Sequence, residues 1–333
     1  MSSRAESADR AAAPRAVRAR ADREVAAPHH AAIRWWPLQF GADDQRGMLN
    51  PVTAAKRAQA LALVRRGRLY DLGHVLDERV PVFPGRYFRQ TLVTTAHQIN
   101  AAGSKLDAEG QVSPKGLGDC DVNWVIENVS TTMQLGTHLD ALCHLQIGDR
   151  GYNGWRVSDL AEAWGVKRLG AETIPQIVTR GWLVDVPAAY GVEQLGVGDV
   201  ITIADVQRAF EGAEPEPGDA VLFHTGWGAH WEDPDSYLEG EPGPGLELAE
   251  WLAARGVALT GCDTWSYGPV PPEDPNAPYH VAQHLNVRHG VFIVENLDTA
   301  ELAADRVREF ALILTHPKLR GATAAWTSPV ALV

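Results

Sequence analysis

Four side chains that can bind a metal ion or move a proton fall within eleven residues of the chain. They are Gln134, His138, Asp140 and His144, and all stand at even positions, so an extended chain would point them to one face. Full extension would spread Gln134 to Asp140 over about 20 Å, at roughly 3.3 Å per residue, whereas ligands lie only about 2 Å from a metal ion. The segment must therefore bend, and Gly136 is the residue at which a tight bend costs least.

These residue types favour a hydrolytic metal centre. A histidine, a carboxylate and an amide oxygen suit Zn²⁺ or Mn²⁺ better than an ion that prefers thiolates. Such an ion polarises a carbonyl group and lowers the pKa of a bound water from about 15.7 towards 7. A histidine of ordinary pKa near 6.5 could take the water proton at neutral pH, and we predict that His144 has this role. Two simpler interpretations remain: His144 only holds a ligand by a hydrogen bond, or the segment is a helix or loop with surface histidines.

Further candidate residues follow predicted strands, where sites in α/β proteins are often built. Glu295 comes directly after the apolar run Val291–Val294 and is a candidate metal ligand. Tryptophan usually supplies core or interface area, so each indole alone is more simply a packing residue, but together they suggest an aromatic-walled pocket. We predict substrate contacts at four residues: Trp155, Trp227, Asp263 and Trp265.

The surrounding sequence supplies helices and strands that can hold such a site. Thr53 can cap a helix over residues 54–66, which has an apolar face and ends before Gly67. Residues 203–211 and 246–255 also predict helices. The alternation with strands predicts an α/β fold with a mixed central sheet or barrel-like core. Six short, mostly apolar runs are typical of strands covered on both faces: Leu69–Leu72, Trp182–Val186, Ala220–Thr225, Val257–Thr260, Val291–Val294 and Phe310–Leu314.

Composition excludes several classes of protein. The 333 residues carry a net charge of −12, which argues against a nucleic-acid binder that works through bulk charge. No apolar run approaches the roughly 20 residues that span a bilayer, so no membrane association is expected. Three scattered cysteines make no disulfide framework, and a cytoplasmic location is expected. The first thirty residues lack Leu, Ile, Phe, Trp and Tyr, so we predict a mobile Ala/Arg-rich tail over 1–34 and a single domain over 35–333.

The segment from Gln134 to His144 resembles the H-x-G-T-H-x-D-x-P-x-H signature of the putative cyclase family of metal-dependent hydrolases. Bacterial kynurenine formamidase and isatin hydrolase belong to this family. The resemblance covers about residues 35–333, and further segments match those of its longer members in the right order: Phe40–Asn50, Tyr152–Trp155, Arg180–Val186, Gly261–Trp265, Glu295–Leu297 and Gly321–Thr323.

The resemblance implies a swivelling β/β/α fold and a homo-oligomer, either a dimer or a tetramer, with sites near a subunit interface. It assigns His138 and Asp140 to the metal ion and the general base to His144. Gln134 stands where the family has its first histidine, a position where longer members often carry glutamine, and its amide oxygen is a weaker ligand. Leu142 replaces the proline of the signature.

The resemblance also concerns a C-terminal cluster that supplies a histidine and a glutamate to a second metal ion or to the substrate. Glu295 matches this glutamate. The histidine falls on Ala282, between His280, Gln283 and His284, any of which could take its place as a metal ligand. We therefore expect one divalent ion, Zn²⁺ or Mn²⁺, rather than two.

Together these features predict a metal-dependent hydrolase that opens a non-peptide C–N bond. The expected substrate is a small aromatic or cyclic amide, such as an aryl-formamide, a lactam or an imide, with esters and lactones also accessible. One alternative is a cyclase- or dehydratase-type lyase, in which His144 takes a proton from carbon. Another is a small-molecule binding protein whose weakened ligand set, with Gln134 and Ala282, has lost catalysis.

Overall fold

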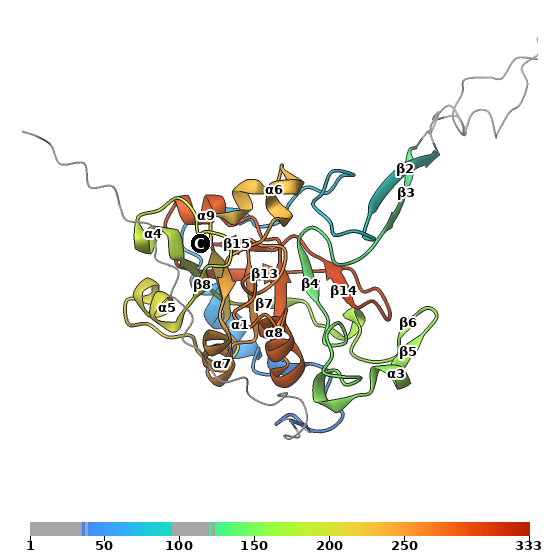
Figure 1. Ribbon diagram of the computed structural model, residues 1–333, viewed down its shortest axis with the longest axis horizontal. Helices are drawn as coiled ribbons and strands as arrows, with labels where there is room; N and C mark the ends of the chain where they lie inside the picture. Colours follow the sequence, from blue (N-terminus) through green and yellow to red (C-terminus); the bar gives the residue numbers. More distant parts are fainter. Residues whose placement is uncertain (1–34, 37–38, 95–119, 121–123) are drawn as a thin grey trace, which may run out of the picture. The chain divides into compact units, whose positions relative to one another are not determined.

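The computed structural model describes residues 35–36, 39–94, 120 and 124–333, so the predicted tail over 1–34 lies outside the described residues. Its main element is a nine-stranded mixed sheet (Figure 1). The strands of this sheet are, in chain order, β1 (Leu69–Asp71), β4 (His138–Asp140), β7 (Ile177–Asp185), β9 (Ala220–His224), β11 (Leu259–Cys262), β12 (Phe292–Glu295), β13 (Glu309–Leu314), β14 (Ala324–Trp326) and β15 (Val330–Leu332).

The order of the strands across the sheet is β1-β15-β13-β7-β9-β11-β12-β4-β14. Strands β7, β9, β11 and β12 run parallel to one another, and the strands on either side of this group are antiparallel. The sheet curls into a half-barrel, which confirms the predicted α/β class with a mixed central sheet.

Each of the six predicted strands is present, with shifts of a few residues at the ends. The largest difference is β7, which begins at Ile177 rather than at Trp182. Its first half, which pairs with β13, alternates between buried and half-buried residues. Because Thr179 and Arg180 interrupt the apolar run there, the sequence did not predict this part. Strands β4, β14 and β15 are only three residues long and were not predicted.

Helices cover both faces of the central strands. Helix α1 (Ala54–Leu61) packs against β7 and β13, whereas α5 (Ile203–Phe210) packs against β7 and α7 (Leu246–Ala254). Thr53 caps α1 as predicted, since its hydroxyl accepts from the backbone N–H of Lys56. The prediction was wrong beyond Leu61, where the chain continues in turns rather than as a helix.

The remaining elements are short. The other α-helices are α3 (Val157–Leu160), α4 (Val186–Tyr190), α6 (Pro234–Leu238), α8 (His280–Gln283) and α9 (Ala300–Ala304). A π-helix, η5 (His284–His289), continues α8 directly. Four segments are 3₁₀-helices: η1 (Gly47–Leu49), η2 (Tyr152–Gly154), η3 (Ala171–Thr173) and η4 (Trp227–His230). Two small sheets pair β5 (Ala161–Glu162) with β6 (Gly165–Val166) and β8 (Val200–Ile201) with β10 (Gly243–Pro244). No helix in these described ranges is long and apolar enough to cross a bilayer.

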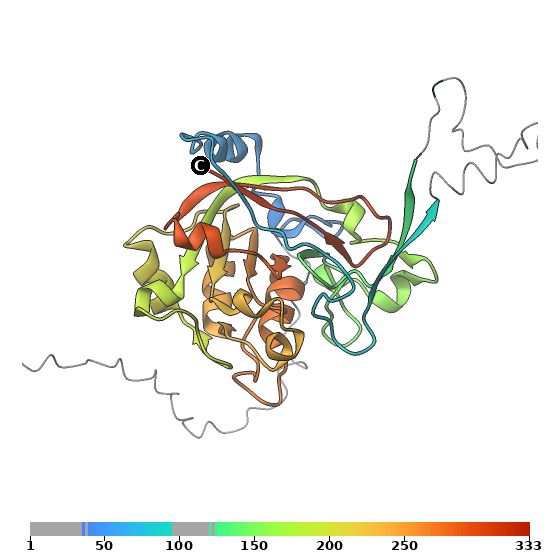
Figure 2. The same cartoon turned by 90° about the horizontal axis from the view of Figure 1, so that it is seen from above.

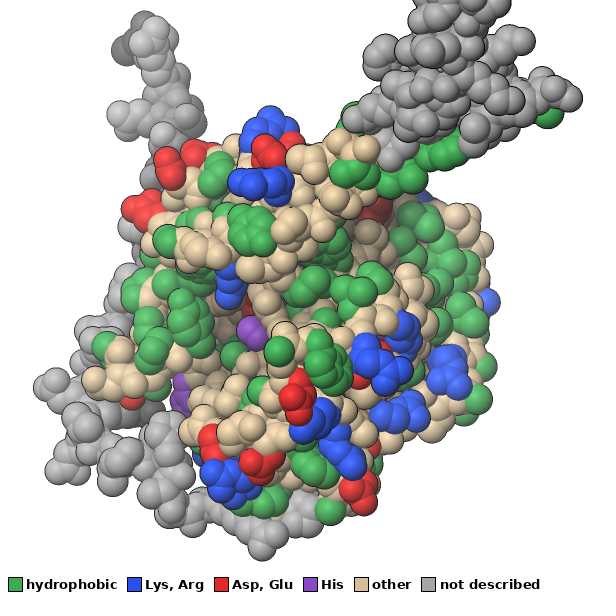
Figure 3. Space-filling model, turned by 90° about the vertical axis from the view of Figure 1, so that its right-hand side faces the viewer, with side chains coloured by type: hydrophobic (Ala, Val, Ile, Leu, Met, Phe, Trp, Pro, Cys, Tyr) green, Lys and Arg blue, Asp and Glu red, His purple; other side chains and the backbone are tan. Residues whose placement is uncertain are grey.

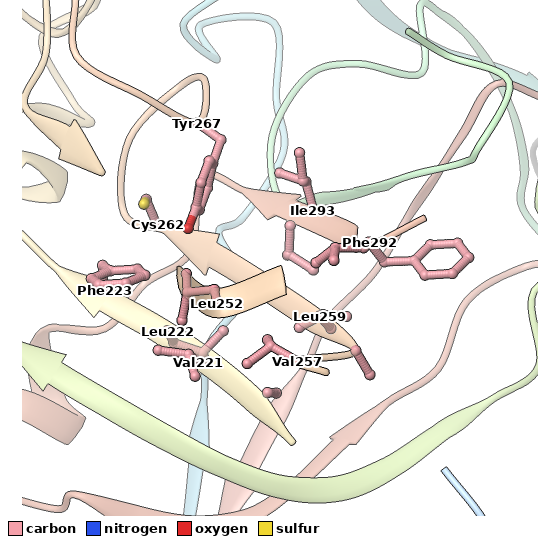
Figure 4. Packing of buried hydrophobic residues seen from close by; sticks show 14 of the residues in the cluster. Val221, Leu222, Phe223, Leu252, Val257, Leu259, Cys262, Tyr267, Phe292 and Ile293 are labelled. Carbon is pink, nitrogen blue, oxygen red and sulfur yellow. The ribbon is translucent and has the colours of Figure 1, made fainter. Parts of the chain in front are cut away.

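The main core lies around the parallel strands. Phe223, Leu259 and Phe292 come from three adjacent strands and are fully buried together with Leu252 of α7 (Figure 4). In Figure 2 the long strands β7 and β13 run along one side of the molecule, with α7 below them. This packing makes the carboxyl ends of the parallel strands a fixed edge on which a site can be built.

A separate hairpin, formed by β2 (Phe88–Thr94) and β3 (Ile126–Thr131), runs away from the nine-stranded sheet (Figure 1). Its side chains are largely exposed although many of them are apolar, and Leu92 has an exposed fraction of 60%. Contiguous exposed apolar residues of this kind are typical of protein–protein contacts.

Candidate metal centre

The predicted metal-binding residues lie on one short strand and its neighbour. In β4, His138 and Asp140 point to one face of the sheet, whereas Leu139 points to the other and is fully buried. Glu295, the last residue of β12, stands directly opposite His138 across the antiparallel pair. Strand pairing therefore brings Glu295 beside two residues that are far from it in the sequence.

The three side chains surround one point. His138 Nε2 lies 3.3 Å from Glu295 Oε2 and 3.5 Å from Asp140 Oδ1, and all three residues are buried. Neither His138 Nε2 nor Asp140 Oδ1 has a hydrogen-bond partner, although both atoms are shielded from solvent. Among the described residues, these three form the one group of His, Cys, Asp and Glu side chains spaced to hold a metal ion. Orphaned buried atoms at this spacing fit a shared divalent cation.

The backbone orients the imidazole of His138 towards this point. Its Nδ1 lies 2.8 Å from the carbonyl oxygen of Gly136, so Nδ1 carries the proton and Nε2 presents its lone pair. Gly136 has a φ of +57°, which confirms the predicted bend, and a Cβ there would come within 2.1 Å of Leu76 Cδ2. The positive φ therefore favours glycine at this position, and a Cβ would also push the Leu76 side chain aside.

The charges of the group also call for a cation. Burial alone would lower the pKa of His138, but Glu295 and Asp140 outweigh it and raise the pKa to about 9. Burial and the negative charge of Asp140 together raise the pKa of Glu295. Without a metal ion, a proton must compensate the two buried carboxylates. A divalent ion supplies the same compensation with shorter contacts, and His, Asp and Glu are the donor set that zinc and manganese accept.

Gln134 and His144 contact each other at the rim of this group. The Gln134 amide nitrogen lies 3.2 Å from His144 Nδ1 and 2.8 Å from Thr323 Oγ1. On the other side of the His144 ring, Nε2 lies 4.0 Å from Asp140 Oδ1. The His144 side chain is 25% exposed, so it can reach both solvent and the buried group. Figure 3 looks onto the side on which β4 and β14 lie and shows a histidine within a hollow of the surface.

Two residues beside the group were not predicted. Trp326 of β14 stands opposite His138 and therefore shares its face of the sheet, and its indole nitrogen is buried without a hydrogen-bond partner. Thr323 contacts Gln134. The sequence signal for both was weak: Gly321–Thr323 is a short match, and Trp326 follows an Ala–Ala pair that does not mark a strand.

The predicted aromatic residues divide into two groups. Trp227 and Trp265 belong to one buried cluster, against which Phe83 and Trp326 also pack. Trp227 donates its indole N–H to the carbonyl oxygen of Tyr237, whereas the Trp265 ring meets the Phe83 ring edge-on at 4.6 Å. Trp155 packs instead against the main core. Trp326 also faces the His138 side of the sheet. The cluster with Trp227 and Trp265 therefore extends to the candidate metal-binding residues.

Asp263 is engaged by the protein itself. Its carboxylate accepts from the backbone N–H groups of Thr225 and Gly226 and from the Thr225 hydroxyl, and it lies 3.3 Å from His224 Nδ1. Burial acts to raise the pKa of Asp263, but the bonds from His224 and Thr225 outweigh it and hold the pKa below its usual value. These contacts fix the turn before Trp227, and a direct contact of Asp263 with substrate stays a prediction.

We expect Asp263→Asn to lower the free energy of unfolding by about 3 kcal/mol at pH 7, because it removes one partner of a buried, hydrogen-bonded ion pair. A lowered carboxylate pKa contributes stability that is present above the unfolded pKa and is lost as the pH falls through the folded value. The difference in unfolding free energy between the variant and the original chain should therefore become smaller below about pH 4. Urea unfolding across this pH range measures it; a constant difference would contradict this role.

The three C-terminal candidates do not join the His138 group. Gln283 donates to the carbonyl oxygen of Gln146 at 2.6 Å. His284 lies with its Nε2 3.1 Å from His289 Nε2, and the His280 ring is 6.0 Å from the His284 ring. Neither His280 nor His284 belongs to the group of His138, Asp140 and Glu295 among the described residues.

Comparisons with known proteins agree with this architecture. The chain matches the family described as "Putative cyclase" over residues 70–269. The crystal structure of a novel cyclase is similar, with 26% sequence identity, a TM-score of 0.76, and coverage of 89% of this chain and 98% of that chain. Isatin hydrolase A from Ralstonia solanacearum shares 22% identity, with a TM-score of 0.55 over 83% of this chain and 95% of that chain.

A third similar structure is isatin hydrolase A from Labrenzia aggregata bound to benzyl benzoate, with 22% identity and a TM-score of 0.52. It is matched over 80% of this chain and 93% of that chain. A search of curated protein sequences found no match. The structural likenesses confirm the fold expected from the sequence resemblance.

Proposed function

Because the chain belongs to the Putative cyclase family, we propose that it is a metal-dependent hydrolase that opens an amide-type C–N bond. The observation that carries this proposal is the buried group of His138, Asp140 and Glu295, with its two partnerless polar atoms. Two of the structures with a similar fold carry the name isatin hydrolase, which supports the proposal of hydrolysis.

Three residues would hold the ion: His138 through Nε2, and Asp140 and Glu295 through their carboxylates. A bound Zn²⁺ or Mn²⁺ supplies Lewis acidity, which polarises the substrate carbonyl and acidifies the attacking water. The hydrogen bond from His138 Nδ1 to Gly136 fixes the donor atom. All three ligands are buried, which limits the access of water molecules that would compete with them for the ion. We propose one ion rather than two.

His144 is proposed as the general base. Its position 4.0 Å from Asp140 and its partial exposure suit a group that takes a proton from water at the edge of the buried site. The proton would move to His144 Nε2 and then to the leaving nitrogen, so that the broken C–N bond ends as a carboxylic acid and an amine. This requires an unprotonated Nε2, and hence a proton on Nδ1.

The amide of Gln134 decides whether His144 is in that state. In the structure the Gln134 Nε2 faces His144 Nδ1 and donates to Thr323 Oγ1. A proton on Nδ1 needs an acceptor, so the amide must turn over: its Oε1 then faces the ring, and the Thr323 hydroxyl donates to the same oxygen. If Oε1 is instead given to the metal ion, Nε2 of the amide faces His144 and the imidazole is protonated on its own Nε2. The predicted role of Gln134 as a metal ligand and a role as partner of an active base thus exclude each other. We propose that Gln134 positions His144.

For Gln134→Ala we therefore expect kcat to fall about 10- to 100-fold, the usual cost of losing an orienting partner, while metal affinity stays unchanged. Steady-state kinetics and metal titration on the same preparation measure the two quantities. The opposite result would show that Gln134 is a ligand: the variant would bind metal more weakly, and its kcat would be unchanged once it is saturated with metal.

The proposed substrate is a small aromatic or cyclic amide. Support comes from the buried aromatic cluster that Trp326 connects to the face of His138, and from the name isatin hydrolase that two similar structures carry. A panel of N-formyl aromatic amines, isatin-like lactams and lactones, turned over in ¹⁸O water, tests this. Hydrolysis places one solvent oxygen in the product; a product without it would point to elimination and refute the hydrolase proposal.

A homo-oligomer is proposed from the hairpin of β2 and β3, which exposes apolar side chains on described residues of both strands. Leu92 pairs with Glu127 and Gln90 pairs with Val129, so Leu92 and Val129 share one face of the hairpin. An apolar face of this kind is stabilised by burial against a second copy.

We expect the double variant Leu92→Lys/Val129→Lys to dissociate into monomers at micromolar concentration, because the added charges cannot be buried in an apolar contact. Light scattering after gel filtration gives the molar mass. Val75→Lys/Val192→Lys, two exposed valines outside the hairpin, provides the same change in charge as a control. An unchanged mass in the first variant would exclude the hairpin as the contact.

A further inference from the structure

A cavity of about 470 Å³ lies at one end of the pairing between β4 and β14. His138 and Trp326 form the last residue pair at this end, and one residue further on the backbone N–H of Thr327 donates to the carbonyl oxygen of Thr137. Thr137, Trp326 and Thr327 line the cavity, together with His74 from the loop after β1. Its volume is typical of sites that bind small molecules.

Several polar groups that line this cavity are already occupied by the protein. The Thr137 hydroxyl donates to the carbonyl oxygen of Asn296, and the Thr327 hydroxyl donates to that of Thr315. Both ring nitrogens of His316 lie within hydrogen-bond distance of backbone carbonyl oxygens. These groups are therefore not available to a ligand.

Two buried nitrogens of residues that line the cavity have no hydrogen-bond partner within the described part of the chain: His74 Nε2 and Trp326 Nε1. Leaving a buried polar atom without a hydrogen bond is costly, so such an atom in a native protein often marks the place of a bound molecule. Both atoms are shielded from solvent at the cavity wall. A small turn of each ring about χ2, a torsion with a broad minimum, opens them to a molecule in the cavity.

The two nitrogens require different partners. The indole N–H of Trp326 can only donate, so it needs an acceptor. The His74 ring is hydrogen-bonded to the backbone of Leu297, and because the Leu297 N–H already donates to Cys262, this bond goes to the Leu297 carbonyl oxygen. Since Nε2 of His74 has no partner, Nδ1 makes this bond and carries the proton. Nε2 therefore offers its lone pair to a donor.

The cavity offers no charged side chain to a ligand. Among the described residues that line it there is no Lys, Arg, Asp or Glu. Burial lowers the pKa of His74 and that of His316, so both imidazoles are uncharged at neutral pH. Charged groups act on these two rings only from outside the lining, three carboxylates on His74 and Lys318 on His316. An ionised ligand would lose its hydration here without gaining a direct counter-ion. Apolar walls come from Leu76, Pro317 and Trp326.

We propose that this cavity is a binding site for a small, neutral aromatic or cyclic amide, whose carbonyl oxygen accepts from the Trp326 N–H and whose N–H donates to His74 Nε2. An amide carries an acceptor and a donor side by side, and its ring would lie against the apolar walls. The site lies beside the metal centre but does not include it, since His138, Asp140 and Glu295 are not among the described residues that line the cavity. The proposal therefore does not rest on the proposed function.

Calorimetric titration of the full-length protein with three probes of equal shape tests the proposal. At pH 7 benzamide is neutral, benzoate is an anion and benzamidine is a cation. We expect one benzamide per chain, bound about 10-fold or more tightly than either charged probe. Trp326→Phe and His74→Phe should each weaken benzamide binding by about 10-fold or more, because each removes a hydrogen-bonding nitrogen and keeps an aromatic ring. Trp164→Phe, at an exposed indole outside the cavity, is the matched control.

Two further variants keep the test decisive if a buried ring cannot be replaced. Thr315 lines the cavity and is exposed, so Thr315→Trp should block benzamide without disturbing the core. In His138→Ala the benzamide affinity should stay unchanged, whereas its loss would place benzamide at the metal centre and overturn the proposal.

Three other results would also overturn the proposal: no saturable binding at millimolar benzamide, equal affinities for the three probes, or an unchanged benzamide affinity in any of Trp326→Phe, His74→Phe and Thr315→Trp. None of these measurements follows turnover, so the hydrolase proposal can fail while this site is confirmed, and the reverse.

Discussion

Replacing His138 by alanine is expected to remove the metal ion from the centre and to lower turnover by about 10³-fold or more, the size of several kcal/mol of transition-state stabilisation. His138 Nε2 is the atom within 3.5 Å of both Asp140 and Glu295, so its loss leaves two buried carboxylates facing each other without a positive partner. Their mutual repulsion raises the pKa of one of them, and a protonated carboxylate is a poor ligand.

Elemental analysis and a metal-dependent thermal shift measure this effect without a known substrate. The original chain should gain thermal stability when Zn²⁺ or Mn²⁺ is added, and His138→Ala should lose the part of this gain that belongs to the centre. His230→Ala is a suitable control, because His230 is hydrogen-bonded to Ser236 and Gln194 and does not belong to the candidate metal-binding residues. If His138→Ala binds the same amount of metal as the control, the proposed centre is wrong.

The second large effect is expected at His144. His144→Ala should reduce kcat by about 10²–10⁴-fold, the usual contribution of a general base, while metal content stays at the level of the original chain. Loss of kcat without loss of metal is expected because His144 Nε2 lies 4.0 Å from Asp140, near the metal-binding residues but not among them. Kinetics and metal analysis on one preparation distinguish this result from that of His138→Ala.

Added imidazole provides the control for His144→Ala. A small base that enters the space left by the side chain should restore part of the activity, because the lost group acts by accepting a proton. An unchanged kcat in His144→Ala would remove the residue from the role of base, and loss of metal would make it a ligand or a support for one.

The sequence predicted those parts of the fold that depend on local apolar pattern. Strands β9, β11 and β12 are mostly apolar because both of their faces are covered, and this pattern shows in the sequence. The spacing of His138 and Asp140, with the bend at Gly136, is also local and was predicted. Which strands lie beside β4 is a long-range property, so Trp326, with no strand-like pattern around it, was missed.

The roles of polar residues were harder to predict, because they depend on partners distant in the sequence. Asp263 follows a strand as a site residue often does, yet its carboxylate is occupied by the turn at Thr225. His284 was considered for the main centre because the histidine of the family's C-terminal cluster falls on Ala282, close beside it. The change from α8 to the π-helix η5 instead directs it to His289, and no sequence signal marks that change in helix type.

The place of β4 in the sheet has a consequence for synthesis of the protein. This strand is made early, yet both of its neighbours, β12 and β14, come from residues 292–295 and 324–326. On the ribosome, β4 must therefore stay unpaired until the residues of β12 and β14 have emerged. Long-range pairing of this kind slows folding and leaves strand edges open meanwhile. Chaperone dependence and incomplete products that cannot bind metal would be the expected signs in the cell.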